Sequence, residues 1–151
     1  NPVTMELGGK NPMIVLDDAD PGRAAEIAVR ACFDNAGQLC VGIERIYVLA
    51  GAYDAFMDRF LARIGGLRMH ASVGWGTDYG SLISAEQLAR TIAVVDDAVA
   101  KGATVITGGK PLPEIGEDVE IVARLALRRH RPVHGEHIGV ARRAAHIATF
   151  Q

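Results

Sequence analysis

Short apolar runs alternate with amphipathic segments along the first 109 residues of the 151-residue chain, and glycine-rich turns separate them. The apolar runs have the length of buried strands, and the segments between them carry apolar residues at helical spacing. Strands that alternate with helices predict an α/β fold with a largely parallel sheet. The predicted strands cover residues 3–7, 12–16, 43–49 and 103–107.

Three helices are predicted, and capping residues mark the beginnings of two of them. Asp20 and Pro21 are typical of a helix start, and this helix should end near Asp34. A second helix should run over residues 52–64, and a third should follow the capping box of Ser84 and run to Lys101. The residues expected to face the core are Ala24, Ile27, Ala28, Ala31 and Cys32 in the first helix, Phe56, Met57, Phe60, Leu61 and Ile64 in the second, and Leu88, Ile92, Val95 and Val99 in the third.

The composition is that of a globular protein in solution, with 49% hydrophobic and 23% charged residues. A formal net charge of -2 argues against generic nucleic-acid binding by the whole chain. No apolar run approaches the ~20 residues of a membrane helix, and residues 1–20 lack the pattern of a signal peptide. We therefore expect a cytoplasmic protein without membrane contacts. Its two cysteines form no disulfide scaffold and match no zinc pattern, so no metal site is expected from them.

Two short motifs contain the residue types needed for thioester chemistry. Residues 35–40 place the thiol of Cys40 on a Gly-containing loop after the first helix, and residues 5–10 place Glu6 beside a Gly-Gly turn. A thiolate can attack a carbonyl group, and a carboxylate can deprotonate water. A loop cysteine is often a packing residue and a lone glutamate is often solvated, but the pairing favours Cys40 as nucleophile and Glu6 as base. Cys32 should be a small buried packing residue instead.

Both motifs closely resemble those of the aldehyde dehydrogenase superfamily, Glu-Leu-Gly-Gly-Lys at residues 6–10 and Gly-Gln-x-Cys at residues 37–40. Asn11-Pro12 and residues 44–48 and 80–84 are also similar. The resemblance covers residues 1–116 and implies an incomplete layered α/β/α catalytic domain. It assigns the catalytic roles to Cys40 and Glu6, and it implies that the turn with Leu7 lies beside the nicotinamide of NAD or NADP. Lys10 and Arg45 are expected to be structural.

The resemblance implies oxidation of a small-molecule aldehyde through a thioester on Cys40. Residues 41–48 look most like those of bacterial succinate-semialdehyde dehydrogenases. No glycine-rich dinucleotide unit precedes Glu6, so the cofactor domain is expected to be absent, and the chain alone is not expected to oxidise aldehydes. The alternative is an inactive truncated remnant or an interaction module. Three points stay open: whether the thiol has a weak esterase activity, whether the cofactor is NAD or NADP, and which oligomeric state the chain adopts.

Residues 117–151 are predicted to be a divergent basic tail. Residues 121–151 contain six arginines, four histidines, no lysine and a single acid, Glu136. The tail has three interpretations: an arm for nucleic acid, a metal site of His130, His134, His137 and His146, or a disordered or frameshifted segment that is not selected for the fold. Its composition favours the third. A helix over residues 119–127 is still compatible with the apolar spacing.

Overall fold

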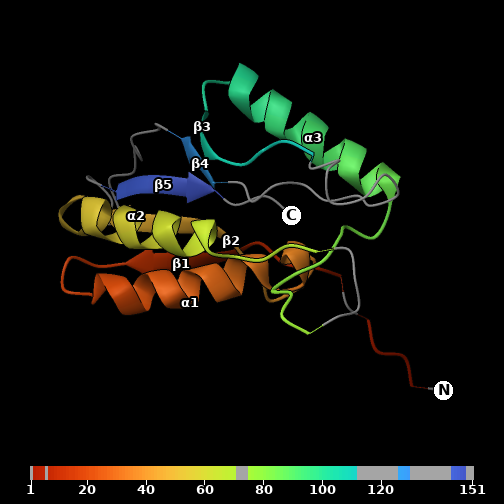
Figure 1. The fold of residues 1–151 in the computed structure, drawn as a ribbon, viewed down its shortest axis with the longest axis horizontal. Coiled ribbons are helices and arrows are strands. Elements are labelled where there is room, and N and C mark those ends of the chain that lie inside the picture. Colours follow the sequence, from red (N-terminus) through yellow and green to blue (C-terminus); the bar gives the residue numbers. More distant parts are fainter. Residues whose placement is uncertain (1, 6, 71–74, 112–125, 130–143, 149–151) are drawn as a thin grey trace.

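The computed structural model describes residues 2–5, 7–70, 75–111, 126–129 and 144–148. These residues form a mixed arrangement of helices and strands, which confirms the α/β fold class (Figure 1). Within this part of the chain, no helix has the length and apolar character that a bilayer crossing requires.

A five-stranded sheet has the order β1-β2-β5-β4-β3. Strands β1 and β2 run parallel, with Val15 beside Val48, whereas β2 with β5, β5 with β4 and β4 with β3 are antiparallel pairs. The expectation of a largely parallel sheet is therefore wrong, because β5 lies next to β2 and runs against it. The strands are β1 (Asn11–Val15), β2 (Ile43–Leu49), β3 (Thr104–Thr107), β4 (Ala126–Arg129) and β5 (Ala144–Ala148).

Three helices begin and end close to the predicted residues. They are α1 (Pro21–Phe33), α2 (Ala50–Gly65) and α3 (Ala85–Ala100), and a one-turn segment, η1 (Asp34–Gly37), follows α1. The Asp20 side chain accepts a hydrogen bond from the Arg23 N–H at 2.6 Å, and the Ser84 hydroxyl accepts one from the Gln87 N–H at 3.2 Å. Both bonds satisfy amide groups that the helix itself leaves without acceptors. The two N-caps predicted from the sequence are thus confirmed.

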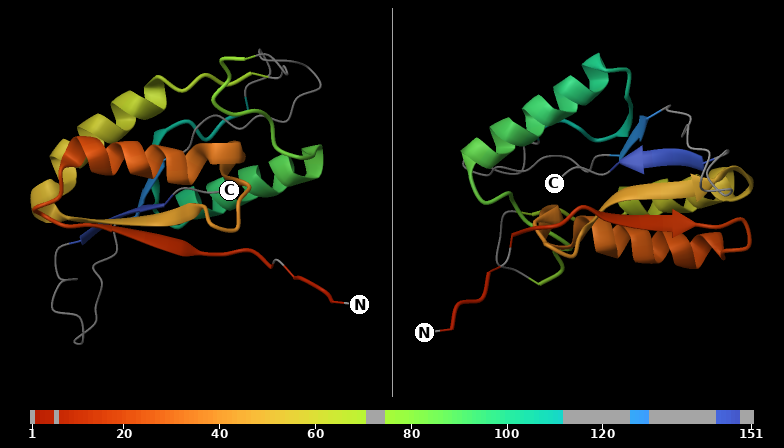
Figure 2. Two further views of the ribbon diagram at one scale, coloured as in Figure 1. Left: turned by 90° about the horizontal axis from the view of Figure 1, so that it is seen from below. Right: turned by 180° about the vertical axis from the view of Figure 1, so that it is seen from behind.

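The main core lies between the β1–β2 part of the sheet and helices α1 and α2, which lie side by side against it (Figure 2). Val15, Ile46 and Val48 supply the strand side of this core. On α2, Phe56 and Phe60 stack with ring centroids 5.3 Å apart. Cys32 is buried among these residues, as predicted.

Some of the predicted core positions are exposed. Ile27 on α1 and Val99 on α3 are nearly half exposed, whereas Ala25 and Val29 are buried on α1. The spacing of apolar residues predicts how wide the buried face of a helix is. It does not predict which residues lie at the middle of that face, because a shift of the face by one residue keeps the same periodicity. The predicted core residues of α2 are correct, except that Leu61 is only partly buried.

The predicted strand at residues 3–7 is wrong for the residues that the structure describes. Residues 2–5 and 7–10 have no regular structure, and Val3, Met5 and Leu7 are largely exposed. The first strand begins only at Asn11, which pairs with Ile43 at the start of β2. An apolar run becomes a strand only where a partner supplies hydrogen bonds.

Two segments of the predicted tail belong to the sheet, since β4 and β5 join the β1–β2 pair to β3. Disorder therefore does not describe residues 126–129 and 144–148. The expected helix over residues 119–127 is wrong at its last two residues, which lie in β4, and its other residues lie outside the described part. His130, His134 and His137 lie outside it too, and His146 is a residue of β5. The domain boundary after residue 116 stays a prediction.

Candidate active site

The loop that carries Cys40 begins with three residues in the left-handed region. Asn35, Ala36 and Gly37 have φ angles of 54°, 56° and 80°. Glycine and asparagine tolerate this conformation, whereas for alanine it costs about 1–2 kcal/mol. The backbone therefore reverses sharply after α1 and carries Cys40 out of the core.

The side chain of Gln38 fastens this loop to a distant segment. Its carboxamide nitrogen donates to the carbonyl oxygens of Asn35 at 3.1 Å and Ser81 at 3.3 Å, and its oxygen accepts from the Ile83 N–H at 2.9 Å. The two segments are separated by more than 40 residues in sequence. The backbone before Cys40 is thus held by the residues that lead into α3.

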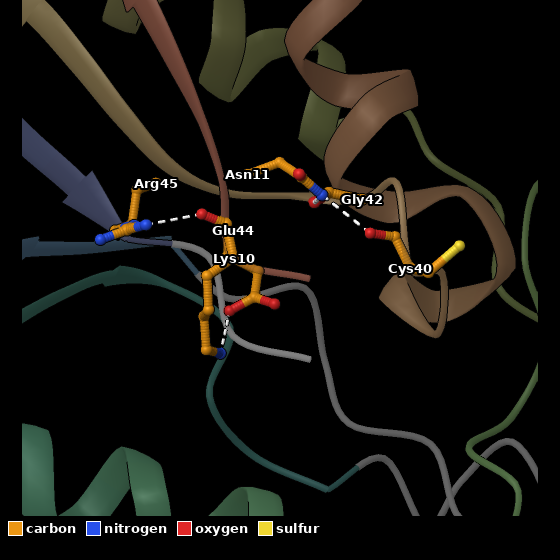
Figure 3. A network of polar contacts seen from close by, with 6 residues as sticks. All are labelled: Lys10, Asn11, Cys40, Gly42, Glu44 and Arg45. Atoms are coloured by element: carbon orange, nitrogen blue, oxygen red, sulfur yellow. Dashed lines mark hydrogen bonds and ion pairs between the residues drawn. The ribbon is translucent and has the colours of Figure 1, made fainter. Parts of the chain in front are cut away.

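Cys40 itself lies in a tight turn and is exposed. The Gly42 N–H donates to the Leu39 carbonyl at 3.0 Å, so Cys40 and Val41 are the central residues of this turn. In Figure 3 the sulfur of Cys40 points away from the polar network that holds its carbonyl oxygen. The thiol is therefore available to a molecule that approaches from outside.

The Gly-Gly turn and the Cys40 loop meet in space. A Cβ atom at Gly9 would lie 2.3 Å from the carbonyl oxygen of Cys40, so only glycine fits this position without a shift of the backbone. Directly after this turn, the side-chain nitrogen of Asn11 donates to the carbonyl oxygens of Cys40 at 2.8 Å and Gly42 at 3.0 Å (Figure 3). The sequence predicted a close approach at the glycines, and the approaching group is the Cys40 peptide.

Lys10 and Arg45 hold the first motif against β2. Lys10 pairs with the buried carboxylate of Glu44, and Arg45 donates to the Lys10 carbonyl at 2.5 Å (Figure 3). No residue in the described part of the chain accepts from the Nε atom of Arg45, although this atom is buried. The structural role expected for Lys10 and Arg45 is in keeping with these contacts.

Two of the three predicted site residues, Cys40 and Leu7, lie within the described part of the chain. Cys40 is exposed on its loop, and Leu7 is 84% exposed next to the Gly-Gly turn. Glu6 lies outside the described residues, so its distance from Cys40 stays a prediction. No group of three or more potential metal ligands occurs in the described part of the chain.

Asn11 is the residue of this site that the sequence analysis did not single out. It was noted only as part of the similarity to the superfamily. The signal was its position directly after a glycine-rich turn and at the start of a strand, where a side-chain amide can reach a neighbouring loop. The sequence does not reveal which carbonyl groups it binds, because they lie about 30 residues away.

Comparison with known proteins identifies the family. The model of the aldehyde dehydrogenase family matches residues 1–124, which is most of the chain. The chain belongs to the aldehyde dehydrogenase family. The resemblance noted in the two motifs is confirmed, and so is the similarity to succinate-semialdehyde dehydrogenases, because relatives with that name are among the matches.

Three aldehyde dehydrogenase relatives illustrate the match. A protein from Mycolicibacterium smegmatis named "Putative succinate-semialdehyde dehydrogenase (NADP+)" is 52% identical over 111 residues, 74% of this chain and 22% of the relative. The structure of succinate-semialdehyde dehydrogenase from Burkholderia pseudomallei has a TM-score of 0.76 and 36% identity, and the match covers 85% of this chain and 26% of that one. Lactaldehyde dehydrogenase from Escherichia coli has a TM-score of 0.70 and 36% identity over 78% of this chain and 25% of that one.

This chain spans about a fifth of the length of the curated aldehyde dehydrogenases and about a quarter of the solved ones. The part that the family model matches, residues 1–124, contains the cysteine loop, the Gly-Gly turn and the helices α1, α2 and α3.

Proposed function

We propose that Cys40 is the nucleophile of an NAD(P)-dependent aldehyde oxidation, with succinate semialdehyde or a similar small aldehyde as substrate. Glu6 is the base that activates water. The observation that carries this proposal is the meeting of the two motifs, because the peptide of Cys40 lies against Gly9 and Asn11. The exposed thiol of Cys40 therefore lies on a loop that contacts the Gly-Gly turn, which follows Glu6 in sequence.

Each residue has a separate task in this reaction. The sulfur of Cys40, as the thiolate, bonds to the aldehyde carbon, and the carbonyl oxygen becomes negatively charged. With NAD or NADP bound, the cofactor would accept the hydride that leaves this carbon, and the acyl group would remain on Cys40 as a thioester. Glu6 takes a proton from a water molecule, the water oxygen bonds to the thioester carbon, and the C–S bond breaks to release the acid and the Cys40 thiolate. The exposure of Cys40 suits the first step, since the aldehyde reaches the sulfur without rearrangement of the core.

The residues next to the Gly-Gly turn fit a nicotinamide ring. Leu7 is 84% exposed, and a Cβ atom at Gly8 would meet no atom within 4 Å, so a flat ring can approach this turn closely. We propose Leu7 as the contact for the ring. When bound, NAD or NADP supplies the hydride acceptor for the oxidation, and positioning it beside Cys40 is the contribution of the protein.

An activated ester tests the nucleophile without the cofactor. The wild-type chain should release 4-nitrophenolate from 4-nitrophenyl acetate and carry one acetyl group on Cys40, as measured by absorbance and by mass spectrometry of the tryptic peptides. C40S should lose this reaction. C32A should keep it, because Cys32 is buried and lies in the core. Acetyl transfer that survives in C40S would refute the proposal.

A second candidate function is an inactive remnant or an interaction module. The observation that favours it is that the family match ends at residue 124, whereas the chain continues to residue 151. The two candidates differ in whether this polypeptide binds NAD or NADP by itself.

A further inference from the structure

We infer that Asn11 is a positioning residue for Cys40, whose carboxamide holds two backbone carbonyls away from the reacting thiol. This inference rests on the proposed function of Cys40 as nucleophile. It adds a residue to which neither the motifs nor the comparisons assign a role.

Asn11 uses both of its side-chain hydrogens on the cysteine loop. The amide nitrogen donates at 2.8 Å to the Cys40 oxygen and at 3.0 Å to the Gly42 oxygen. These two carbonyl groups belong to the residues directly before and directly after Val41. A single side chain therefore fixes two peptide groups of the turn from outside.

The side-chain amide of Asn11, which we call the clamp, is itself fixed in position. Asn11 is the first residue of β1, where its backbone pairs with Ile43 of β2. On the adjacent side, Gly9 lies so close that a Cβ atom there would be 2.3 Å from the Cys40 oxygen and 2.9 Å from the Asn11 nitrogen. The turn thus lies between the clamp and a glycine, and it has little room to rotate.

The direction of the carbonyl groups matters for the chemistry. A carbonyl oxygen carries a negative partial charge and opposes the negative charge that develops on the oxygen of a substrate under attack. Asn11 holds the Cys40 and Gly42 oxygens on the β1 side of the turn, and the thiol points elsewhere (Figure 3). Because the peptide bond is trans, the Val41 N–H points away from Asn11. Without the Asn11 amide, the Cys40 and Gly42 oxygens lose the donor that holds them on that side of the turn.

Two reactions of the Cys40 thiol distinguish a positioning role of Asn11 from a general loss of structure in the cysteine loop. In acetyl transfer from 4-nitrophenyl acetate, the sulfur bonds to the acyl carbon, an oxyanion forms, and 4-nitrophenolate leaves. In alkylation by iodoacetamide, the sulfur bonds to the methylene carbon and iodide leaves, without an oxyanion. N11L is close in size to the wild type but has no donor. It should slow acetyl transfer about 10- to 100-fold and should change the alkylation of Cys40 by less than about 2-fold.

A second variant gives a pH profile. N11D keeps the shape but places an acceptor against two carbonyl oxygens, so its acetyl transfer should also be slow at neutral pH. Protonation of the introduced carboxyl group, whose ordinary pKa is about 4, restores one donor. The ratio of the N11D rate to the wild-type rate at the same pH should therefore rise as the pH falls from about 7 to about 4. Q87E makes the same chemical change on α3 and should show no such rise.

Cys32 serves as the internal measure of folding because it is buried in the core. The inference is supported if N11L loses acetyl transfer alone while Cys32 stays protected from iodoacetamide. It is overturned if N11L reacts like the wild type in both assays. It is also overturned if both reactions change together or Cys32 becomes reactive in N11L and N11D, because the role is then merely structural. If wild-type Cys40 accepts no acetyl group, the proposed nucleophile fails first and the inference with it.

Discussion

The contact between Gly9 and the Cys40 peptide shows how a single missing side chain joins two motifs. Gly9 is exposed to solvent on one side and crowded on the other, where the Cys40 oxygen occupies the space of a Cβ atom. Backbone atoms cannot move aside as a flexible side chain can. Glycine is therefore needed at position 9 because the Cys40 oxygen leaves no room for a Cβ atom. The φ angle of Gly9 is not the reason, since only Gly8 of this pair has a positive φ.

We expect G9A to lower the free energy of unfolding by about 1–3 kcal/mol, because the added methyl group overlaps the Cys40 carbonyl. The urea midpoint measures this loss. G65A is the matched control, since a Cβ atom at Gly65 meets nothing within 4 Å and this residue ends α2. The control should gain up to about 1 kcal/mol. Equal stability of G9A and the wild type would mean that the turn and the loop do not touch.

At this scale the sequence predicts the type of residue but not its partner. The thiol on the loop and a close approach at the Gly-Gly turn were both predicted, and the roles of Cys40 and Glu6 stay predictions. Asn11 could not be assigned, because its function depends on two carbonyl groups that come near only after β1 pairs with β2. A contact between residues distant in sequence leaves no local pattern.

Helices were easier to predict than strands because their hydrogen bonds close within the element. Asp20 and Ser84 mark the beginnings of α1 and α3 by side-chain bonds to residues three positions ahead. The apolar run at residues 3–7 had the composition of a strand, but its described residues pair with no neighbour. Strand propensity reflects the surroundings of a residue more than its own preference.

The N-cap of α1 offers a test at this scale. D20A removes the acceptor for the Arg23 N–H and should lower the free energy of unfolding by about 1 kcal/mol. D20N keeps an acceptor oxygen at the same place and should stay within a few tenths of a kcal/mol of the wild type. Both values come from urea unfolding followed by circular dichroism. A loss in D20N as large as that in D20A would point to the charge of Asp20 and not to its hydrogen bond.

For the whole molecule, the sequence predicted the fold class and the core of α2 but not the directions of the strands. Alternating helices and strands suggest a parallel sheet, and β1 with β2 follows that rule. The other three pairings involve β4 or β5, which come from a part of the chain with no strand pattern of its own. Which strand becomes a neighbour is decided by the rest of the fold.

Cofactor binding separates the two candidate functions at the scale of the whole molecule. Under the proposed function, NAD or NADP should raise the Tm, because Leu7 is exposed beside the Gly-Gly turn and is the proposed contact for the nicotinamide ring. A ligand at 100 times its Kd adds about 2.7 kcal/mol of stability, which thermal unfolding detects readily. A complete enzyme of the family is the positive control. No rise with either cofactor would contradict the proposed binding and would favour the inactive remnant.

The position of β5 has a consequence for the order in which the sheet assembles. This strand follows the other four in sequence, yet it lies between β2 and β4 in the sheet. Until residues 144–148 pair with both neighbours, one edge of β2 has no partner in the sheet, and β3 and β4 are not joined to the β1–β2 pair. The helices can form early because their hydrogen bonds are local, whereas closure of the sheet needs a contact as distant in sequence as that of Arg45 with Ala148. Until then, packing against α1 and α2 supports β1 and β2.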